Sequence, residues 1–141
     1  MRIPDTLLEI HQFLDEGYKP LIDFGEWRVA ILRYIDELEP QNLTKMQRHD
    51  ETDEVFVLLE GRCILFLGEG DKQVTSIHAQ DMNPLKLYNV KKSCWHTHTL
   101  SKDATVLIVE NRDTANHNSP EIEITPEQTE KLVELTRILW A

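Results

Sequence analysis

The sequence contains little cysteine and no apolar run long enough to span a membrane. Its 141 residues include two cysteines, Cys63 and Cys94, which are too few for a disulfide framework and are expected to be reduced thiols. No basic segment followed by an apolar segment opens the chain, so no secretory signal is indicated. These absences predict a cytoplasmic protein with no membrane partner.

Positive charge is also scarce. Lys and Arg number 15 against 25 Asp and Glu, which gives a formal net charge of −10. Nucleic acids and anionic membranes both require a basic face, so neither is expected as a partner. The sequence also lacks a nucleophile elbow, a phosphate-binding glycine loop, a paired-cysteine zinc pattern and an EF-hand loop.

The hydrophobic content and the length of the chain favour one folded domain over residues 1–141. Hydrophobic residues make up 40% of the chain, which can build a core, and the length favours one domain over two. Between residues 20 and 112, short apolar runs alternate with turn residues, a pattern that is typical of a β-sandwich or barrel. We therefore predict an all-β domain with its barrel core in this range.

One amphipathic helix is predicted at each end of the barrel. In residues 4–16 apolar side chains recur at helical spacing, and Gly17 supplies a stop. In residues 125–140, Thr125, Pro126 and Gln128 have the pattern of a capping box. The apolar stripes of these helices are expected to pack on the barrel or on a second subunit.

Two strands are predicted to be buried on both faces. Residues 55–59 and 63–67 are apolar at every position, whereas a strand with one solvated face alternates. One face can look into the barrel, and the other needs a further cover. We expect a homodimer to provide it, and the terminal helices of the same chain are the alternative.

The stretch between residues 47 and 61 carries the main chemical signal. On a strand, Gln47 and His49 point the same way, and after a short acidic turn Glu54 opens the next strand. This spacing can bring an imidazole and a carboxylate together, as a divalent metal site requires. Gly61 then supplies a tight turn before another apolar strand.

This stretch resembles the first motif of the cupin superfamily, in which two His, then Glu, then Gly recur at the same spacing. Gln47 stands where the family has its first His, whereas His49, Glu54 and Gly61 match the later positions. A second segment resembles the motif that ends in a further His, here His96. The resemblance covers about residues 27–112.

The resemblance implies a double-stranded β-helix, an RmlC-like cupin or jelly-roll barrel, with the short N-terminal helix and the C-terminal helix added to it. The second motif departs from the family pattern, because Lys91 and Ser93 replace its Pro and Gly.

His49, Glu54 and His96 are therefore the first candidates for metal ligands. Two imidazoles and a carboxylate suit Zn, Fe, Mn or Ni. His98 shares the strand face of His96, so it could replace the imidazole that is absent at Gln47, and Gln47 could itself ligate through its carbonyl oxygen. In the alternative, these residues bind no metal and only hydrogen-bond to one another and to water.

Three further residues are candidates for the substrate pocket. Arg33 and Tyr34 lie on a strand that should line the barrel, and one of the two is expected to face inward; Arg33 would then pair with an anionic ligand. Lys45 shares a face with Gln47 and could supply an inner cation, or it could lie at the rim. Trp95 is expected to face away from His96.

The leading functional hypothesis is a metal-binding cupin that holds a small polar metabolite, such as a sugar or an organic acid. As an enzyme it would be an isomerase, lyase, hydrolase or dioxygenase, with His98 or Glu54 as the proton carrier. A second hypothesis is a metal-free cupin similar to nucleotide-sugar ketoisomerases, with His49 or His96 as the base. The third is a non-catalytic ligand-binding or sensor module.

Overall fold

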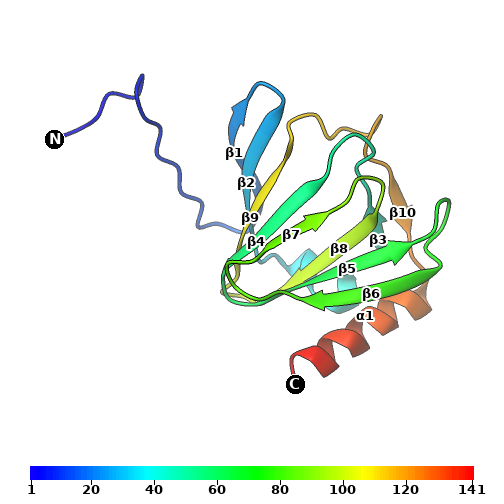
Figure 1. The fold of residues 1–141 in the computed structure, drawn as a ribbon. Coiled ribbons are helices and arrows are strands. Elements are labelled where there is room, and N and C mark those ends of the chain that lie inside the picture. The colour runs from blue at the N-terminus through cyan, green and yellow to red at the C-terminus, as the bar shows by residue number, and fades with distance from the viewer.

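Two five-stranded antiparallel sheets make up the protein in the computed structural model, which describes residues 1–141 (Figure 1). Sheet A has the strand order β1 (Gly17–Phe24), β2 (Trp27–Arg33), β9 (Thr105–Asn111), β4 (Glu54–Glu60) and β7 (Leu87–Val90). Sheet B has the order β10 (Glu121–Glu123), β3 (Lys45–Gln47), β8 (Trp95–Leu100), β5 (Cys63–Glu69) and β6 (Ser76–Asp81).

Neighbouring strands come from distant parts of the sequence. β4 lies between β9 and β7, and β8 lies between β3 and β5, so the chain passes repeatedly from one sheet to the other. This topology is that of a double-stranded β-helix, and it confirms the predicted jelly-roll barrel. No helix is long and apolar enough to cross a membrane.

The barrel core lies between the two sheets. Twelve buried apolar residues form it, and they come from both sheets and their connections: Ala30, Leu32, Phe56, Leu58, Cys63, Leu65, Met82, Val90, Leu100, Ala104, Val106 and Ile108. Successive residues of β5 face opposite sides, so Cys63 and Leu65 point into this core while Ile64 and Phe66 point outward.

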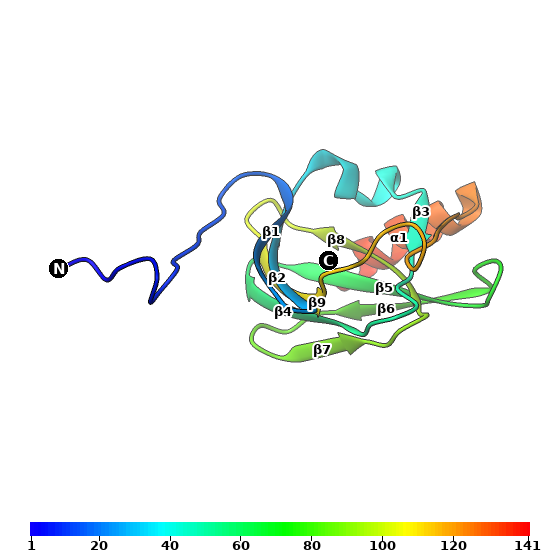
Figure 2. The same ribbon diagram turned by 90° about the horizontal axis from the view of Figure 1, so that it is seen from above.

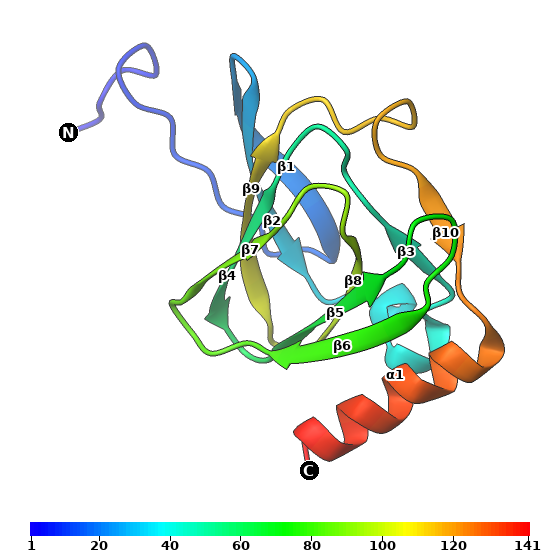
Figure 3. The same ribbon diagram turned by 45° about the vertical axis from the view of Figure 1, so that its right-hand side comes forward.

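A second apolar cluster covers the outside of sheet B. Ile64, Phe66 and Trp95 pack there with Leu132 of α1 (Pro126–Leu139), which runs beneath the sheet (Figure 3). The helix begins with the predicted capping box: the Thr125 side chain accepts from the Gln128 N–H, and the Gln128 side chain accepts from the Thr125 N–H. Such a cap contributes about 1 kcal/mol.

The predicted N-terminal helix is absent. Residues 4–16 contain a single turn, in which the N–H groups of Leu7 and Leu8 donate to the Pro4 carbonyl, and the rest is extended (Figure 1). A short amphipathic helix needs a surface under its apolar face. This segment has none, because Leu7 and Ile10 remain 76% and 86% exposed. The helix prediction was therefore wrong.

Two connections have defined geometry. The acidic turn after β2 forms two 3₁₀ helices, η1 (Asp36–Leu38) and η2 (Pro40–Asn42). A loop with Gly70 at φ of 114° precedes β6, which occupies Ser76–Asp81.

Candidate metal centre and pocket

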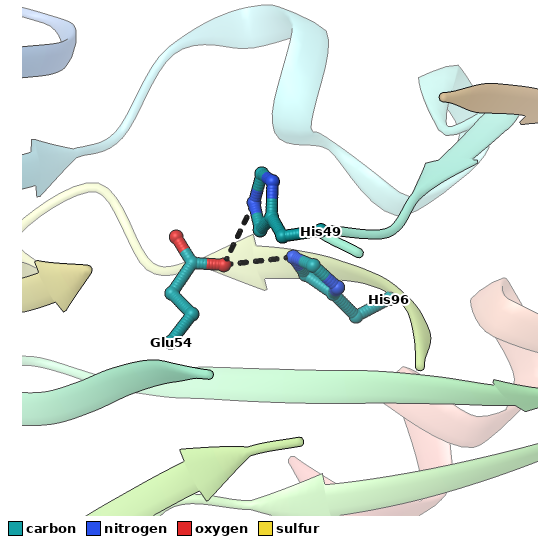
Figure 4. Close-up of side chains that lie close together, drawn as sticks. All are labelled: His49, Glu54 and His96. Carbon is teal, nitrogen blue, oxygen red and sulfur yellow. Dashed lines mark ion pairs between the residues drawn. The ribbon is translucent and has the colours of Figure 1, made fainter. Parts of the chain in front are cut away.

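Three elements bring His49, Glu54 and His96 together inside the barrel (Figure 4). His49 follows β3, Glu54 is the first residue of β4, and His96 lies near the start of β8. β3 pairs with β8 through Gln47 and His96, so the two His-bearing segments are adjacent. Trp95 points the other way, into the apolar cluster between sheet B and α1, as its position before His96 predicts.

The ligand atoms of the three residues converge. Glu54 Oε1 lies 2.9 Å from His96 Nε2 and 3.3 Å from His49 Nε2 (Figure 4). One ligand atom from each residue lies within 4.8 Å of the others, and all three side chains are buried. These residues could hold a metal ion.

Hydrogen bonds on the far side of each ring fix where the imidazole protons are. His96 Nδ1 lies 3.0 Å from the Cys94 carbonyl, which can only accept, so Nδ1 carries the proton. His49 Nδ1 lies 2.7 Å from Ser119 Oγ. The Ser119 hydroxyl donates to Asn118 Oδ1, so it accepts from His49 Nδ1–H.

Two hydrogen bonds hold the Asn118 side chain in the orientation in which its Oδ1 accepts from Ser119. Its amide nitrogen donates to the Glu51 carboxylate and to the Asp113 carbonyl, which leaves Oδ1 as the acceptor for Ser119. With Nδ1 protonated, a neutral His49 ring and a neutral His96 ring both leave Nε2 unprotonated, at 3.3 and 2.9 Å from Glu54 Oε1.

Two unprotonated ring nitrogens and a carboxylate oxygen at these distances fit a bound cation. Glu54 Oε1 is buried, and neither imidazole is aligned for a hydrogen bond to it despite the short distances. The alternative is to protonate the rings. Burial by itself lowers the pKa of His96, but the Glu54 carboxylate outweighs it and raises that pKa. Burial likewise favours a neutral Glu54, but the two imidazoles hold its pKa well below the usual range.

A second carboxyl group, Glu110 of β9, faces this cluster. Tyr18 and Thr114 hydroxyls donate to its Oε1 at 3.4 and 3.3 Å, whereas its Oε2 is buried without a partner. Burial, and then the neighbouring Glu54, raise the pKa of Glu110 to about 9. Burial and Glu110 also raise the pKa of Tyr18. The pocket thus holds one carboxylate and one carboxylic acid at neutral pH.

The cavity between these groups has a volume of about 340 Å³. Its walls combine polar groups with two aliphatic side chains, and the lining residues are Tyr18, Leu32, Gln47, His49, Glu54, His96, His98, Ile108, Glu110 and Thr114. Cavities of this size hold small metabolites.

His98 and Gln47 line the cavity, and His98 lies outside the group of converging ligand atoms. His98 shares the strand face of His96, as predicted, and its Nδ1 is buried without a partner. Burial and then the neighbouring His96 lower the pKa of His98 to about 4, so the ring is neutral at pH 7. The Gln47 amide donates to the Ser119 carbonyl at 3.3 Å.

Arg33, Tyr34 and Lys45 do not line the cavity. Arg33 lies on the outside of sheet A and donates to Thr105 Oγ1, and the Tyr34 hydroxyl donates to the carboxylates of the following turn. The inward residue of β2 is Leu32, and the strand ends at Arg33 before Tyr34 could follow it inward. The expectation that Arg33 or Tyr34 faces inward is therefore not met. Lys45 is exposed and lines an adjoining hollow near η1 and η2, which shares Gln47, His96 and His98 with the cavity.

Four residues of the site escaped sequence reasoning: Tyr18, Glu110, Thr114 and Ser119. Residues 111–120 form a polar connection without a motif, yet Asn118 and Ser119 are buried there and Ser119 contacts His49. Glu110 offered a signal, because it continues the inward-facing positions of Val106 and Ile108 along β9.

Comparisons with known proteins support the fold. No protein-family model and no curated protein matches the sequence. Among solved structures, the capsular polysaccharide assembling protein CapF of Staphylococcus aureus gives a TM-score of 0.57 at 17% identity, over 86% of this chain and 34% of that one. The nucleoside dehydratase Pac13 of Streptomyces, with uridine, gives 0.54 at 9% identity, over 84% and 88%.

A cupin-2 domain protein of Shewanella frigidimarina gives a TM-score of 0.47 at 16% identity, over 77% of this chain and 88% of that one. The solved structures with this architecture are cupin and jelly-roll folds, so the chain has the cupin fold that its motifs predict.

Proposed function

We propose that the protein binds one divalent transition metal through His49, Glu54 and His96, and holds a small polar metabolite in the adjoining cavity. The observation that carries this proposal is the convergence of the two imidazole Nε2 atoms and the buried Oε1 of Glu54. Two nitrogens and one carboxylate oxygen suit Zn, Fe, Mn or Ni, with further positions left for a ligand.

The metal, when bound, supplies a Lewis acid that polarises a carbonyl or hydroxyl oxygen. The chain's own groups would then handle protons. Glu110, which keeps its proton at neutral pH, can donate from Oε2 to a substrate oxygen. His98 is neutral and can accept a proton at its free ring nitrogen. Together they form an acid and a base on the walls of one cavity, which supports isomerase, lyase or hydrolase chemistry.

The cavity favours a polyhydroxylated or acidic small molecule. Its volume of about 340 Å³ accommodates a monosaccharide or a small organic acid, and eight of its ten lining residues carry polar side chains. Gln47 and Thr114 add hydrogen-bonding groups to the cavity wall.

A metal-free enzyme is the second candidate, because the buried Glu54 lies 2.9 Å from His96 and can serve as its ionic partner. In that case His96, whose pKa is raised beside Glu54, would carry a proton, and Glu54 would stabilise the imidazolium. This candidate uses the same cavity and requires no cation.

Calorimetric titration with Zn²⁺ of protein from which a chelator has removed any metal distinguishes the metal-binding candidate from the metal-free one. We expect tight one-to-one binding by the wild type, loss of measurable binding in His96→Ala, and about 10- to 100-fold weaker binding in Ser119→Ala, because Ser119 only orients His49. The matched control is His78→Ala, which removes an exposed histidine that pairs with Glu69. Equal affinities in all four proteins would contradict the proposed site.

A further inference from the structure

The cavity adjoins a second hollow, which lies between β3 and β8. β8 pairs with β5 along all six of its residues, but it pairs with β3 only through His96 and Gln47. Beyond this pair no ladder joins the two strands, and η1 and η2 border the space between them (the cyan coils in Figure 2). The Thr99 hydroxyl holds η1 beside β8 by donating to the Leu38 carbonyl at 2.7 Å. The hollow has a volume of about 470 Å³.

Three residues, Gln47, His96 and His98, line both the cavity and the hollow, so the two spaces meet at their side chains. His98 Nδ1 is buried there without a hydrogen-bond partner, and a buried polar atom that is left unpaired costs stability. The Gln47 side chain makes a single hydrogen bond, which its amide nitrogen donates to the Ser119 carbonyl, so its amide oxygen is free to accept. A ligand that extends across this junction would satisfy both groups.

Polar side chains of both charge signs form the outer wall of the hollow. Glu37, Lys45 and Glu121 are exposed there, and none of the three pairs with a neighbouring side chain. Asn42 donates from its amide nitrogen to the Asp36 carbonyl at 2.9 Å, which leaves its Oδ1 as a further acceptor. The wall thus offers one ammonium group, two carboxylates and an amide oxygen to a bound molecule.

This wall does not suit an apolar or an anionic ligand. Two of its three apolar residues, Leu43 and Met46, are 4% and 1% exposed and therefore present almost no surface. Two carboxylates outnumber the single ammonium group, so a phosphate or a carboxylate would meet net repulsion. A hydroxyl group, in contrast, can donate to a carboxylate and accept from an ammonium group. The wall therefore favours a neutral molecule with many hydroxyl groups.

We propose that the hollow is a second subsite for the ligand of the cavity, and that this ligand is a neutral saccharide of at least two units. One sugar unit lies beside the metal ligands, and the next lies in the hollow between β3 and η2. The proposal rests on the proposed function, since it takes the cavity as the site of the first unit. A monosaccharide would fill the inner space alone, and a nucleotide sugar would bring its diphosphate against Glu37 and Glu121.

Binding to immobilised sugars tests the second subsite. The probe is an array of neutral mono- and disaccharides of glucose, galactose, mannose and N-acetylglucosamine, and the protein is the full chain incubated with Zn²⁺. We expect at least one disaccharide to retain the protein. Calorimetry with that free disaccharide should give a dissociation constant about tenfold or more below those of its constituent monosaccharides. An array on which no disaccharide retains the protein, or on which monosaccharides retain it equally, overturns the proposal.

Substitutions that fill the hollow locate the disaccharide on the protein. Lys45→Trp fills it from β3 and Glu121→Trp from β10, and each is expected to raise the dissociation constant of the disaccharide by about tenfold or more. Lys19→Trp is the matched control, because it replaces an exposed lysine of β1 in the other sheet, and it should leave this constant unchanged. If neither filling variant binds the disaccharide more weakly than Lys19→Trp does, the disaccharide lies elsewhere and the subsite is overturned.

Zinc titration of the same variants distinguishes the subsite from the metal centre. Lys45 and Glu121 lie outside the group of converging ligand atoms, so both filling variants should bind Zn²⁺ with wild-type affinity, which also shows that they fold. A wild type that binds Zn²⁺ without any preference for disaccharides contradicts the subsite alone. A wild type that prefers disaccharides but binds no Zn²⁺ supports the subsite and contradicts the metal centre.

Discussion

Glu54 and Glu110 are neighbours in one pocket, yet their surroundings drive their pKa values in opposite directions. Two imidazoles face Glu54 and favour its ionised form. Only two hydroxyl groups donate to Glu110, and burial beside another carboxylate favours its neutral form. Separated pKa values of this kind distinguish the roles of paired carboxyl groups, so Glu54 is assigned to the cation and Glu110 to proton donation.

The charge state of Glu110 has a consequence for stability. The pKa of Glu110 in the folded protein, about 9, lies above the unfolded value near 4.5. The contribution of Glu110 to folding stability is therefore fully present below about pH 4.5 and is lost as pH rises through 9. We expect the unfolding free energy of the metal-free wild type to fall between about pH 6 and pH 9, and to fall less in Glu110→Gln.

Chemical denaturation at a series of pH values measures this difference. His96, whose pKa is also raised, loses its stabilising contribution over part of the same range. It does so in both proteins, so the comparison isolates Glu110. Parallel curves for the two proteins would show that Glu110 is ionised at neutral pH.

For single residues, the sequence was sufficient to predict a member of the site where a motif determines the spacing. His49, Glu54 and His96 come together because strand parity and a short turn place them there. Tyr18 and Ser119 could not be found in this way. Tyr18 depends on the pairing of β1 with β2, and Ser119 depends on the path of a loop between β9 and β10.

At the element scale, the two chain ends show why an amphipathic pattern alone does not predict a helix. α1 has a capping box, and its apolar face packs on the outside of sheet B, where Leu132 is fully buried. Residues 4–16 have comparable apolar side chains, but these side chains stay exposed because no sheet face of the chain covers them. Helical stability in proteins comes mostly from packing of the apolar face, which a sequence pattern does not report.

The turn between β4 and β5 depends on glycine. Gly61 has φ of 75°, and a Cβ there would lie 2.5 Å from Ala104 Cα. We expect Gly61→Ala to lower the unfolding free energy by about 3 kcal/mol or more. The matched control is Gly25→Ala, with φ of 57° and open space around the position, which should cost only about 1–2 kcal/mol. Thermal denaturation of both variants checks this, and equal losses would contradict the proposed close approach.

At the scale of the whole molecule, the alternation of apolar runs and turns predicted the β barrel, and the motif spacing predicted its cupin topology. Which sheet face is covered could not be predicted. β4 and β5 are equally apolar in sequence, but α1 packs under only one of the two sheets. That choice depends on where the connection after β10 directs the helix.

The proposed function depends on whether the buried His49, Glu54 and His96 cluster holds a metal ion. Elemental analysis by mass spectrometry of the purified, tag-free protein, before and after chelation and reloading, measures this. We predict close to one Zn, Fe, Mn or Ni ion per chain, lost on chelation and regained on reloading. A protein that contains no metal as purified, and takes up none when reloaded, would contradict the account.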